Sequence, residues 1–367
     1  MISPESRTIE WIRSVSRERR VKDIGLLEKT IRAFSLLESL SRSGCPFVFK
    51  GGSCLMLHFN TEKRLSIDID IICPPGTEID KYLETYAEEY GFQKPELLNR
   101  TSRFNIPKQH AKYNYQVSYT GGKSDYVLLD VLLEDSPYNH LEKKAIRSPF
   151  LITEGEDVFV DVPSMSDILG DKLAAFAPNT TGIPYFKKDK NGIDRDCAQE
   201  IAKQLFDVAC LIDSLDNFEN TFDVYKRNVA VELEYRGMTD KNFDDVLNDS
   251  RTTALCLGTS GAFEKDRFEL LNTGFPKLTN FMYGSKKYRL EQAVVDSAKI
   301  AYLSACFQKG VFIPEKYAPN KVGRLINAEI DSSLDTDSVK WSKLNKLKKS
   351  NIEAFYYWFR TFELLKS

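Results

Sequence analysis

The sequence has 367 residues, of which 42% are hydrophobic and 28% charged, which is typical of a globular protein with a sizeable core. The formal net charge of −2 excludes a strongly basic chain, so any nucleic-acid-binding surface must be local. Seven cysteines without a C-x-x-C pair and only three histidines argue against a zinc site and favour reduced thiols in a cytoplasmic protein. No apolar run reaches the length of about 18–20 residues that crosses a membrane, and the N-terminal stretch has no signal-peptide core.

Hydrophobic periodicity predicts strands in the first half of the chain and helices in the second. Apolar residues at helical spacing indicate helices, and period-two alternation of β-branched residues indicates strands. The expected helices cover residues 21–44, 53–60, 79–92, 164–176, 198–215, 290–307 and 351–366, and the expected strands cover 46–50, 64–72, 111–120 and 125–135. A Gly-Gly pair at 121–122 joins the last two strands as a hairpin-like turn. The sequence thus predicts an α+β protein with a boundary near residue 165, giving domains 1–165 and 166–367.

Two aspartates stand among isoleucines in the strand "RLSIDIDII". Residues i and i+2 of a strand point to the same side, so Asp68 and Asp70 face one way, roughly 6–7 Å apart, and the isoleucines face the other. A divalent cation such as Mg²⁺ would relieve the repulsion between the carboxylates. Asp130, a charge within the apolar strand "YVLLDVLLED", is the candidate third carboxylate. The alternative is an amphipathic strand with a solvated acidic face.

The residues before this strand favour a phosphate ligand. Gly51 and Gly52 allow the backbone to approach a ligand closely, and Ser53 follows at the expected start of a short helix. Its hydroxyl and the N–H groups of the helix N-terminus can bind a triphosphate. Arg64, on the approach to the acidic strand, can neutralise phosphate charge. Metal and nucleotide together would explain why carboxylates stand among core residues.

This arrangement resembles the DNA polymerase beta-like nucleotidyltransferase superfamily, and more specifically motif I of the AbiEii/AbiGii-type toxins of type IV toxin–antitoxin systems. The interval between Ser53 and Asp68 is slightly long for the superfamily pattern. The resemblance implies a polymerase beta-like core, with a small mixed sheet flanked by helices, and an all-helical C-terminal domain. The residues that match motif I are Lys50, Gly51, Gly52, Ser53, Arg64, Ser66, Asp68 and Asp70.

Two downstream segments extend the resemblance. "DKLAAF" is similar to the family's K-L-x-A motif and supplies Lys172, and "AKQLFDVACLI" is similar to its last motif and supplies Lys203 and Asp207. Gln204 stands where the family often has an aspartate. By resemblance, Lys172 contacts the nucleotide and Asp207 is a base for the acceptor. The alternatives are that Lys172, at the start of an apolar helical stretch, is a surface lysine, and that Asp207 pairs with Lys203 at i, i+4.

The resemblance implies an enzyme that transfers NMP from an NTP to RNA, with tRNA as the leading acceptor. In it, Asp68, Asp70 and Asp130 bind Mg²⁺, with Mn²⁺ as the alternative ion. The family is associated with abortive infection and growth inhibition, and each toxin has an antitoxin encoded nearby. Phosphorylation of the hydroxyl at Ser66 would silence such a site by adding negative charge. The alternatives are a nucleotide- or RNA-binding module without turnover, and a transferase acting on a protein or small-molecule hydroxyl.

Two basic stretches with interleaved aromatic residues are candidate RNA-binding surfaces. A run of this kind is also typical of a solvated helix face, so both interpretations stay open. The first stretch contains Arg100, Arg103, Lys108, His110 and Lys112, and the second contains Lys340, Trp341, Lys343, Lys346, Lys348 and Lys349.

Overall fold

The computed structural model describes the chain apart from residues 60–63, 99–107, 190, 286, 326 and 337–338. The chain divides into two compact units. The first comprises Met1–Ser164 with Asn280–Lys287, and the second comprises Met165–Thr279 with Tyr288–Ser367. The first break lies one residue from the boundary drawn from the sequence, but residues 280–287 return to the first unit.

Backbone hydrogen bonds hold this returning segment in the first unit. The N–H of Leu65 donates to the carbonyl of Phe281 at 2.8 Å, and Arg64 and Met282 form an isolated antiparallel bridge. The N–H of Gly284 donates to the carbonyl of Arg19, also at 2.8 Å. No periodicity in the sequence marks these pairings, because they join segments more than 200 residues apart.

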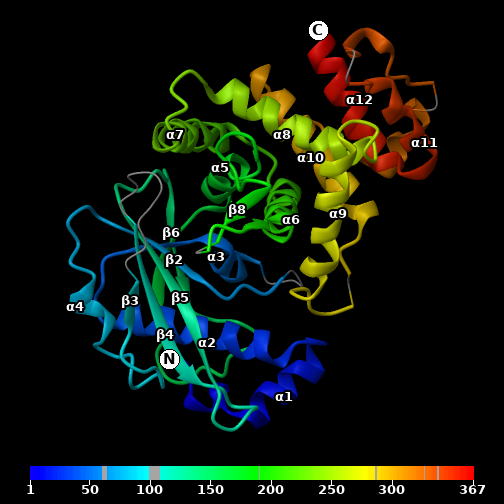
Figure 1. The fold of residues 1–367 in the computed structure, drawn as a ribbon. Helices are drawn as coiled ribbons and strands as arrows, with labels where there is room; N and C mark the ends of the chain where they lie inside the picture. Colours follow the sequence, from blue (N-terminus) through cyan, green and yellow to red (C-terminus); the bar gives the residue numbers. More distant parts are fainter. Residues whose placement is uncertain (60–63, 99–107, 190, 286, 326, 337–338) are drawn as a thin grey trace. The chain divides into compact units, whose positions relative to one another are not determined.

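The first unit is built on a mixed sheet whose described strands lie in the order β3-β4-β5-β2-β1-β7-β6 (Figure 1). β2 is parallel to β5 and β1 is parallel to β7, whereas the other neighbours are antiparallel. β4 and β5 form the hairpin expected from the sequence. The strands are β1 (Val48–Lys50), β2 (Ile69–Cys73), β3 (Glu96–Leu98), β4 (Lys108–Gln116), β5 (Ser124–Leu133), β6 (Leu141–Ala145) and β7 (Phe159–Pro163).

One face of the sheet is buried against helix α2 (Ile24–Arg42), which contacts β2 and β5. Alternate strand residues such as Phe49 and Leu129 are fully buried, whereas their neighbours on the strand are only partly so. The helix begins where the carboxylate of Asp23 accepts the N–H of Leu26, a standard N-cap. The expected helix over residues 21–44 is therefore confirmed.

The other described helices of this unit are short. They are the 3-10 helix η1 (Pro4–Arg7), α1 (Ile9–Glu18), α3 (Gly51–His58) and α4 (Asp80–Leu83). The helix expected over residues 79–92 is wrong beyond Leu83. There the chain turns back so that the N–H of Phe92 donates to Ala87, and Phe92 packs edge-on against Tyr113 with ring centroids 5.6 Å apart. Burial of this ring outweighs the helical periodicity.

The second unit is helical apart from one hairpin. Helix α10 is buried along almost its whole length, between α8, α12 and α6. The helices expected over 164–176, 198–215, 290–307 and 351–366 are confirmed as α5, α6, α10 and α12. The described helices are α5 (Met165–Ala174), α6 (Ala198–Ser214), α7 (Glu219–Tyr235), α8 (Phe243–Gly258), α9 (Lys265–Thr279), α10 (Leu290–Gln308), α11 (Leu347–Ser350), α12 (Ile352–Lys366) and three 3-10 helices, η2 (Pro319–Leu325), η3 (Ser332–Leu334) and η4 (Trp341–Lys346).

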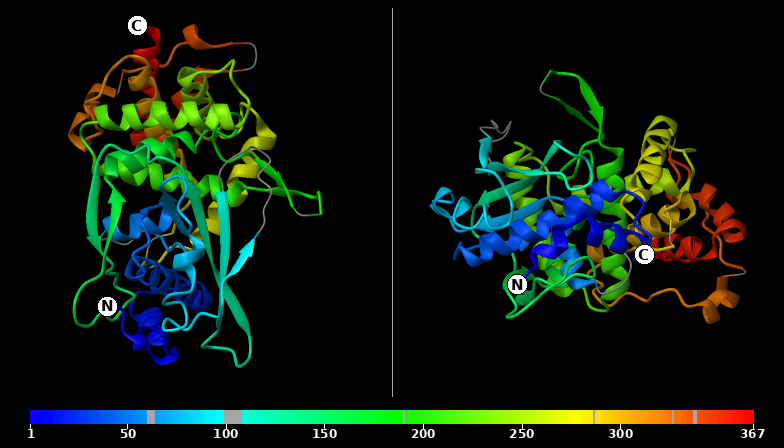
Figure 2. Two further views of the ribbon diagram at one scale, coloured as in Figure 1. Left: turned by 90° about the vertical axis from the view of Figure 1, so that its left-hand side faces the viewer. Right: turned by 90° about the horizontal axis from the view of Figure 1, so that it is seen from below.

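The hairpin of β8 (Phe186–Lys188) and β9 (Asp194–Asp196) departs from the expected all-helical domain. It extends away from the helices of its unit as a narrow green ribbon (Figure 2). The carboxylate of Asp189 accepts the N–H groups of Asn191 and Ile193, and Gly192 adopts a φ of +77°. These are local turn interactions, which a search for helical periodicity misses.

Candidate active site

Four polar side chains form a row across one face of the sheet in the first unit. The strand register pairs His110 with Asp130, Asp130 with Asp70, and Asp70 with Lys50, across β4, β5, β2 and β1. Residues paired in register point to the same face, and neighbouring strands lie about 4.8 Å apart. These residues, here called the polar row, are partly exposed, whereas both strand neighbours of Asp70 and Asp130 are buried.

The two carboxylates at the centre of the row are direct cross-strand neighbours. Like charges directly opposite each other destabilise a sheet. In this row each carboxylate has a basic side chain on its outer side, Lys50 beside Asp70 and His110 beside Asp130. The arrangement thus concentrates negative charge between two strands and places basic groups at its margins.

Asp68 lies outside the strand that the sequence predicted for it. β2 begins at Ile69, and residues 65–68 precede it without regular structure. The side chain of Asp68 is partly buried. Its backbone carbonyl accepts a hydrogen bond of 2.5 Å from the hydroxyl of Ser53, so the position of Asp68 is fixed by helix α3 rather than by strand pairing.

Helix α3 begins at Gly51, two residues earlier than expected, and its first two glycines make space for the site. Gly51 has a φ of +81°, and a Cβ there would lie 2.2 Å from a carboxylate oxygen of Asp70. At Gly52 a Cβ would lie 2.7 Å from Nη2 of Arg64 and 2.9 Å from Oγ of Ser66. Neither glycine can be replaced without moving one of these polar groups.

The N-terminus of α3 is the candidate anion site. Lys50 occupies the N-cap position, and its side chain makes no capping hydrogen bond. The Ser53 hydroxyl, expected to bind phosphate, is instead only 1% exposed and donates to Asp68. Phosphate binding here would therefore depend on the backbone N–H groups of the first turn and on Arg64, which lies over Gly52.

His110 is the site residue that sequence reasoning missed. It was grouped with the basic stretch, yet its Nδ1 lies 2.5 Å from Oδ1 of Asp130. The sequence did contain a signal for this pair. In the hairpin the numbers of paired residues add up to 240, as expected for strands that turn around residue 120, so His110 stands opposite Asp130. Arg100 and Arg103 of the same stretch lie outside the described residues.

The second unit contains Lys172 and Asp207, which pair with each other. Nζ of Lys172 lies 2.8 Å from Oδ2 of Asp207, and the two side chains are 6% and 3% exposed. Lys172 is in the last turn of α5, not at the start of a helix, and it is not a surface lysine. Asp207, on α6, thus has a partner on another helix in addition to any contact with Lys203. Nζ of Lys172 also donates to the amide oxygen of Gln204 at 3.4 Å.

The polar row suits a hard divalent cation as its ligand. Mg²⁺ binds proteins through one or two carboxylates and keeps water or substrate phosphate as its remaining ligands. Asp70 and Asp130 provide two such carboxylates on adjacent strands. Among the described residues no three His, Cys, Asp or Glu side chains are grouped so that they could hold a metal ion on their own. The donor set therefore fits an ion that shares its coordination with a bound phosphate.

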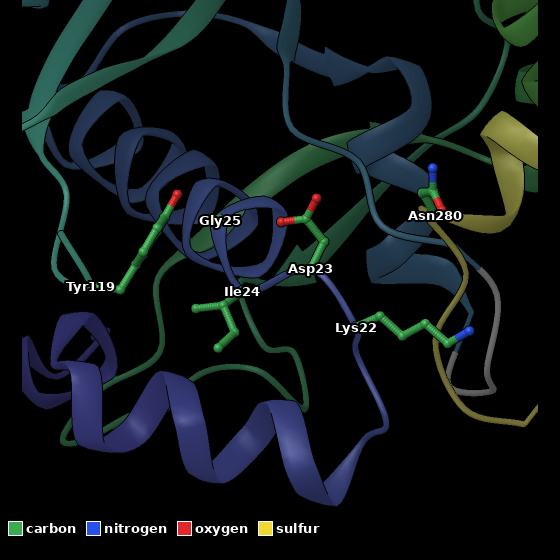
Figure 3. A pocket seen from close by; sticks show the side chains of 6 residues that line it. All are labelled: Lys22, Asp23, Ile24, Gly25, Tyr119 and Asn280. Atoms are coloured by element: carbon green, nitrogen blue, oxygen red, sulfur yellow. The ribbon is translucent and has the colours of Figure 1, made fainter.

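A cavity of about 480 Å³ in the first unit contains none of the predicted site residues. It opens at the start of α2, where Asp23 and Tyr119 lie on one side and Lys22 and Asn280 on the other (Figure 3). Asp23 already caps α2. The cavity is therefore lined in part by residues with a structural role, and the polar row remains the better candidate site.

The C-terminal basic stretch offers no exposed tryptophan for base stacking. Trp341 is 8% exposed and packs edge-on against Trp358 with ring centroids 5.7 Å apart. The ammonium of Lys346 donates to the carbonyl of Thr259 at 2.7 Å, and burial lowers the pKa of Lys346. Trp341 and Lys346 therefore make contacts within the second unit instead of facing solvent. In the described part of the chain no helix is both long and apolar enough to cross a membrane.

A match to a known family identifies the chain as a nucleotidyltransferase. The chain belongs to the family described as nucleotidyl transferase AbiEii toxin of type IV toxin–antitoxin systems, whose profile matches residues 35–271, more than half of the chain. This family assignment implies a nucleotide substrate and an antitoxin partner. The matched range includes every predicted site residue.

Comparison with solved structures gives a distant likeness to a protein from H. pylori that is provisionally assigned as a nucleotidyltransferase. The two chains are 13% identical, with a TM-score of 0.39, over 78% of this chain and 94% of the other. A likeness this distant does not bear on function. No curated protein matches the chain.

The buried pair of Lys172 and Asp207 predicts a stability effect that is separate from catalysis. Lys172→Met removes the ammonium that lies 2.8 Å from Oδ2 of Asp207, and breaking a buried ion pair in this way typically costs about 3–5 kcal/mol of unfolding free energy. The double variant Lys172→Met/Asp207→Leu should recover most of this loss, because no buried charge remains. Urea unfolding followed by circular dichroism measures both effects.

The control is Lys265→Met, which removes an exposed partner of Glu269 in the same unit and should leave stability nearly unchanged. A Lys172→Met variant as stable as Lys265→Met would show that the buried pair does not stabilise the second unit.

Proposed function

We propose that the chain is a Mg²⁺-dependent enzyme that transfers NMP from an NTP to a hydroxyl group of RNA, with tRNA as the favoured acceptor. Family membership gives the reaction class. The observation that supports the metal dependence is the direct pairing of Asp70 with Asp130 on adjacent parallel strands. A divalent cation would offset the repulsion between these two opposed carboxylates, and a nucleoside triphosphate binds together with such a cation.

In this proposal some of the site residues bind the metal ion and the others bind the triphosphate. Asp70 and Asp130 bind the cation together with the triphosphate, and Asp68, which precedes β2, stays a sequence prediction as the third ligand. The N-terminus of α3, opened by Gly51 and Gly52, binds the triphosphate with the help of the Arg64 guanidinium. Lys50, at the N-cap, adds positive charge beside Asp70.

The reaction itself needs little covalent chemistry from the protein. The oxygen of the acceptor hydroxyl forms a bond to the α-phosphorus, the bond from the α-phosphorus to the bridging oxygen breaks, and pyrophosphate leaves. When bound, Mg²⁺ would polarise the α-phosphate and offset the charge on the departing pyrophosphate. The hydroxyl proton passes to a base, for which the family resemblance suggests Asp207.

One contact in the first unit supports the choice of RNA as acceptor. Lys112 lies on the same strand as His110, and its ammonium is 4.5 Å from the ring centroid of Tyr126, which is 36% exposed. A cation next to an exposed aromatic ring suits RNA phosphate and an unpaired base. The preference for tRNA rests on the family resemblance.

Removal of one carboxylate of the row should abolish transfer. Asp70→Asn and Asp130→Asn each take away a metal ligand, so the rate should fall by at least about 100-fold. The measurement is incubation with each α-³²P-labelled NTP, Mg²⁺ and total tRNA, followed by electrophoresis. Protein extract in place of tRNA tests the alternative acceptor.

Asp161→Asn is the matched control, because Asp161 is a carboxylate of the same sheet that pairs with Lys143. Equal labelling by wild type, Asp70→Asn and Asp161→Asn would contradict a metal-dependent site in the polar row. NTP binding without release of pyrophosphate would favour a binding module.

The space at Gly51 gives a second prediction. Gly51→Ala forces a residue with a side chain into a φ of +81° and pushes the Asp70 carboxylate aside. Gly76→Ala meets the same φ of +81°, with no atom within 4 Å of the added Cβ. Gly76→Ala should lose about 1–2 kcal/mol of unfolding free energy from its backbone conformation alone and Gly51→Ala at least as much, but only Gly51→Ala should lose transferase activity. Equal activity of the two variants in the labelling assay would contradict a role for this space.

A further inference from the structure

His110 makes one specific contact with the proposed metal-binding carboxylate. Nδ1 of the imidazole lies 2.5 Å from Oδ1 of Asp130, and the two side chains are 14% and 34% exposed. An ionised carboxylate only accepts hydrogen bonds, so Nδ1 is the donor. The contact joins residues that are paired in the β4–β5 register, so both backbones hold it in place.

This contact leaves the two oxygens of Asp130 in different situations. Oδ1 accepts the hydrogen bond from Nδ1 of His110. Oδ2 takes no part in this contact and remains for a cation. Without a partner, a partly exposed aspartate can rotate about two side-chain bonds, and repulsion from Asp70 would favour rotamers that point away from it. The imidazole ring holds the carboxylate in one orientation instead.

The two ends of the polar row differ in the kind of group they provide. Lys50, opposite Asp70, is a point charge on a long flexible stem. His110 is a rigid ring with one donor aimed at one oxygen. Since Mg²⁺ prefers oxygen ligands, an imidazole here acts through Asp130 rather than as a ligand itself.

We propose that His110 is a positioning residue for the metal site, which fixes the orientation of the Asp130 carboxylate and thereby raises the affinity for a divalent cation. The proposal rests on the proposed function, because it takes Asp130 as a metal ligand. Residues that hydrogen-bond a metal ligand typically contribute 10- to 100-fold in metal affinity. His110 should therefore matter for metal binding even though it does not touch the metal.

A pair of amide substitutions separates this role from a merely structural one. Asn places its side-chain N–H₂ near the position of Nδ1, where it can still donate to Asp130. Gln places the same group near the position of Nε2, where it cannot. His110→Gln is closer in size to histidine, so a packing role predicts that it is tolerated better, whereas a positioning role predicts that His110→Asn is.

The experiment measures Mn²⁺ binding to the full chain by electron paramagnetic resonance in the presence of a non-hydrolysable NTP analogue, with the analogue alone as the blank. His110→Gln should raise the dissociation constant by about 10- to 100-fold, and His110→Asn should keep it within a few fold of wild type. Asn114→Leu is the control, since Asn114 lies on the same strand and bonds Glu96 rather than Asp130. Thermal unfolding of each variant confirms that it is folded.

The outcomes distinguish this proposal from the proposed function. If Asp130→Asn loses Mn²⁺ but both His110 variants bind it as tightly as wild type, the positioning role is wrong and the metal site stands. Equal losses in His110→Asn and His110→Gln would likewise overturn it. If wild type and Asp130→Asn bind Mn²⁺ equally weakly, the polar row is not the metal site. That result contradicts the proposed function and, with it, the role of His110.

Discussion

The constraint that governs the candidate site is the repulsion between two carboxylates, which the strand register of the sheet places side by side. Asp70 and Asp130 face each other across two parallel strands, and the residues next to them on these strands, Ile69, Ile71, Leu129 and Val131, are buried in the core. A change of strand register cannot relieve the repulsion between the carboxylates. A shift by one residue would turn the carboxylates into the core and the isoleucines and leucines out of it. A cation that joins the two side chains turns an unfavourable contact into a binding site.

The surrounding residues are arranged to suit such a cation. Gly51 leaves space for the Asp70 carboxylate, Ser53 holds the backbone of Asp68, and His110 orients Asp130. The contacts come from two elements, α3 for the first two and β4 for the last. Tertiary packing therefore determines the geometry of the carboxylates. The proposed metal site and the proposed phosphate site both depend on this packing.

The sequence predicts the elements with strong periodicity and the residues with unusual chemistry. The helix α2, the β4–β5 hairpin and the α+β class follow from the pattern of apolar residues, and Asp130 is conspicuous as a charge in an apolar strand. The partners of these residues are harder to predict. The pairing of Lys172 with Asp207 joins two helices, and the contact of Ser53 with Asp68 depends on the exact start of β2, so neither follows from local periodicity.

The most direct test of this account is a crystal structure of the protein with Mn²⁺ and a non-hydrolysable NTP analogue. Anomalous scattering then locates the metal independently of any assumption about its ligands. The account predicts a manganese peak between the carboxylates of Asp70 and Asp130, with the triphosphate at the N-terminus of α3. A peak elsewhere, or a triphosphate bound away from Gly51 and Gly52, would contradict it.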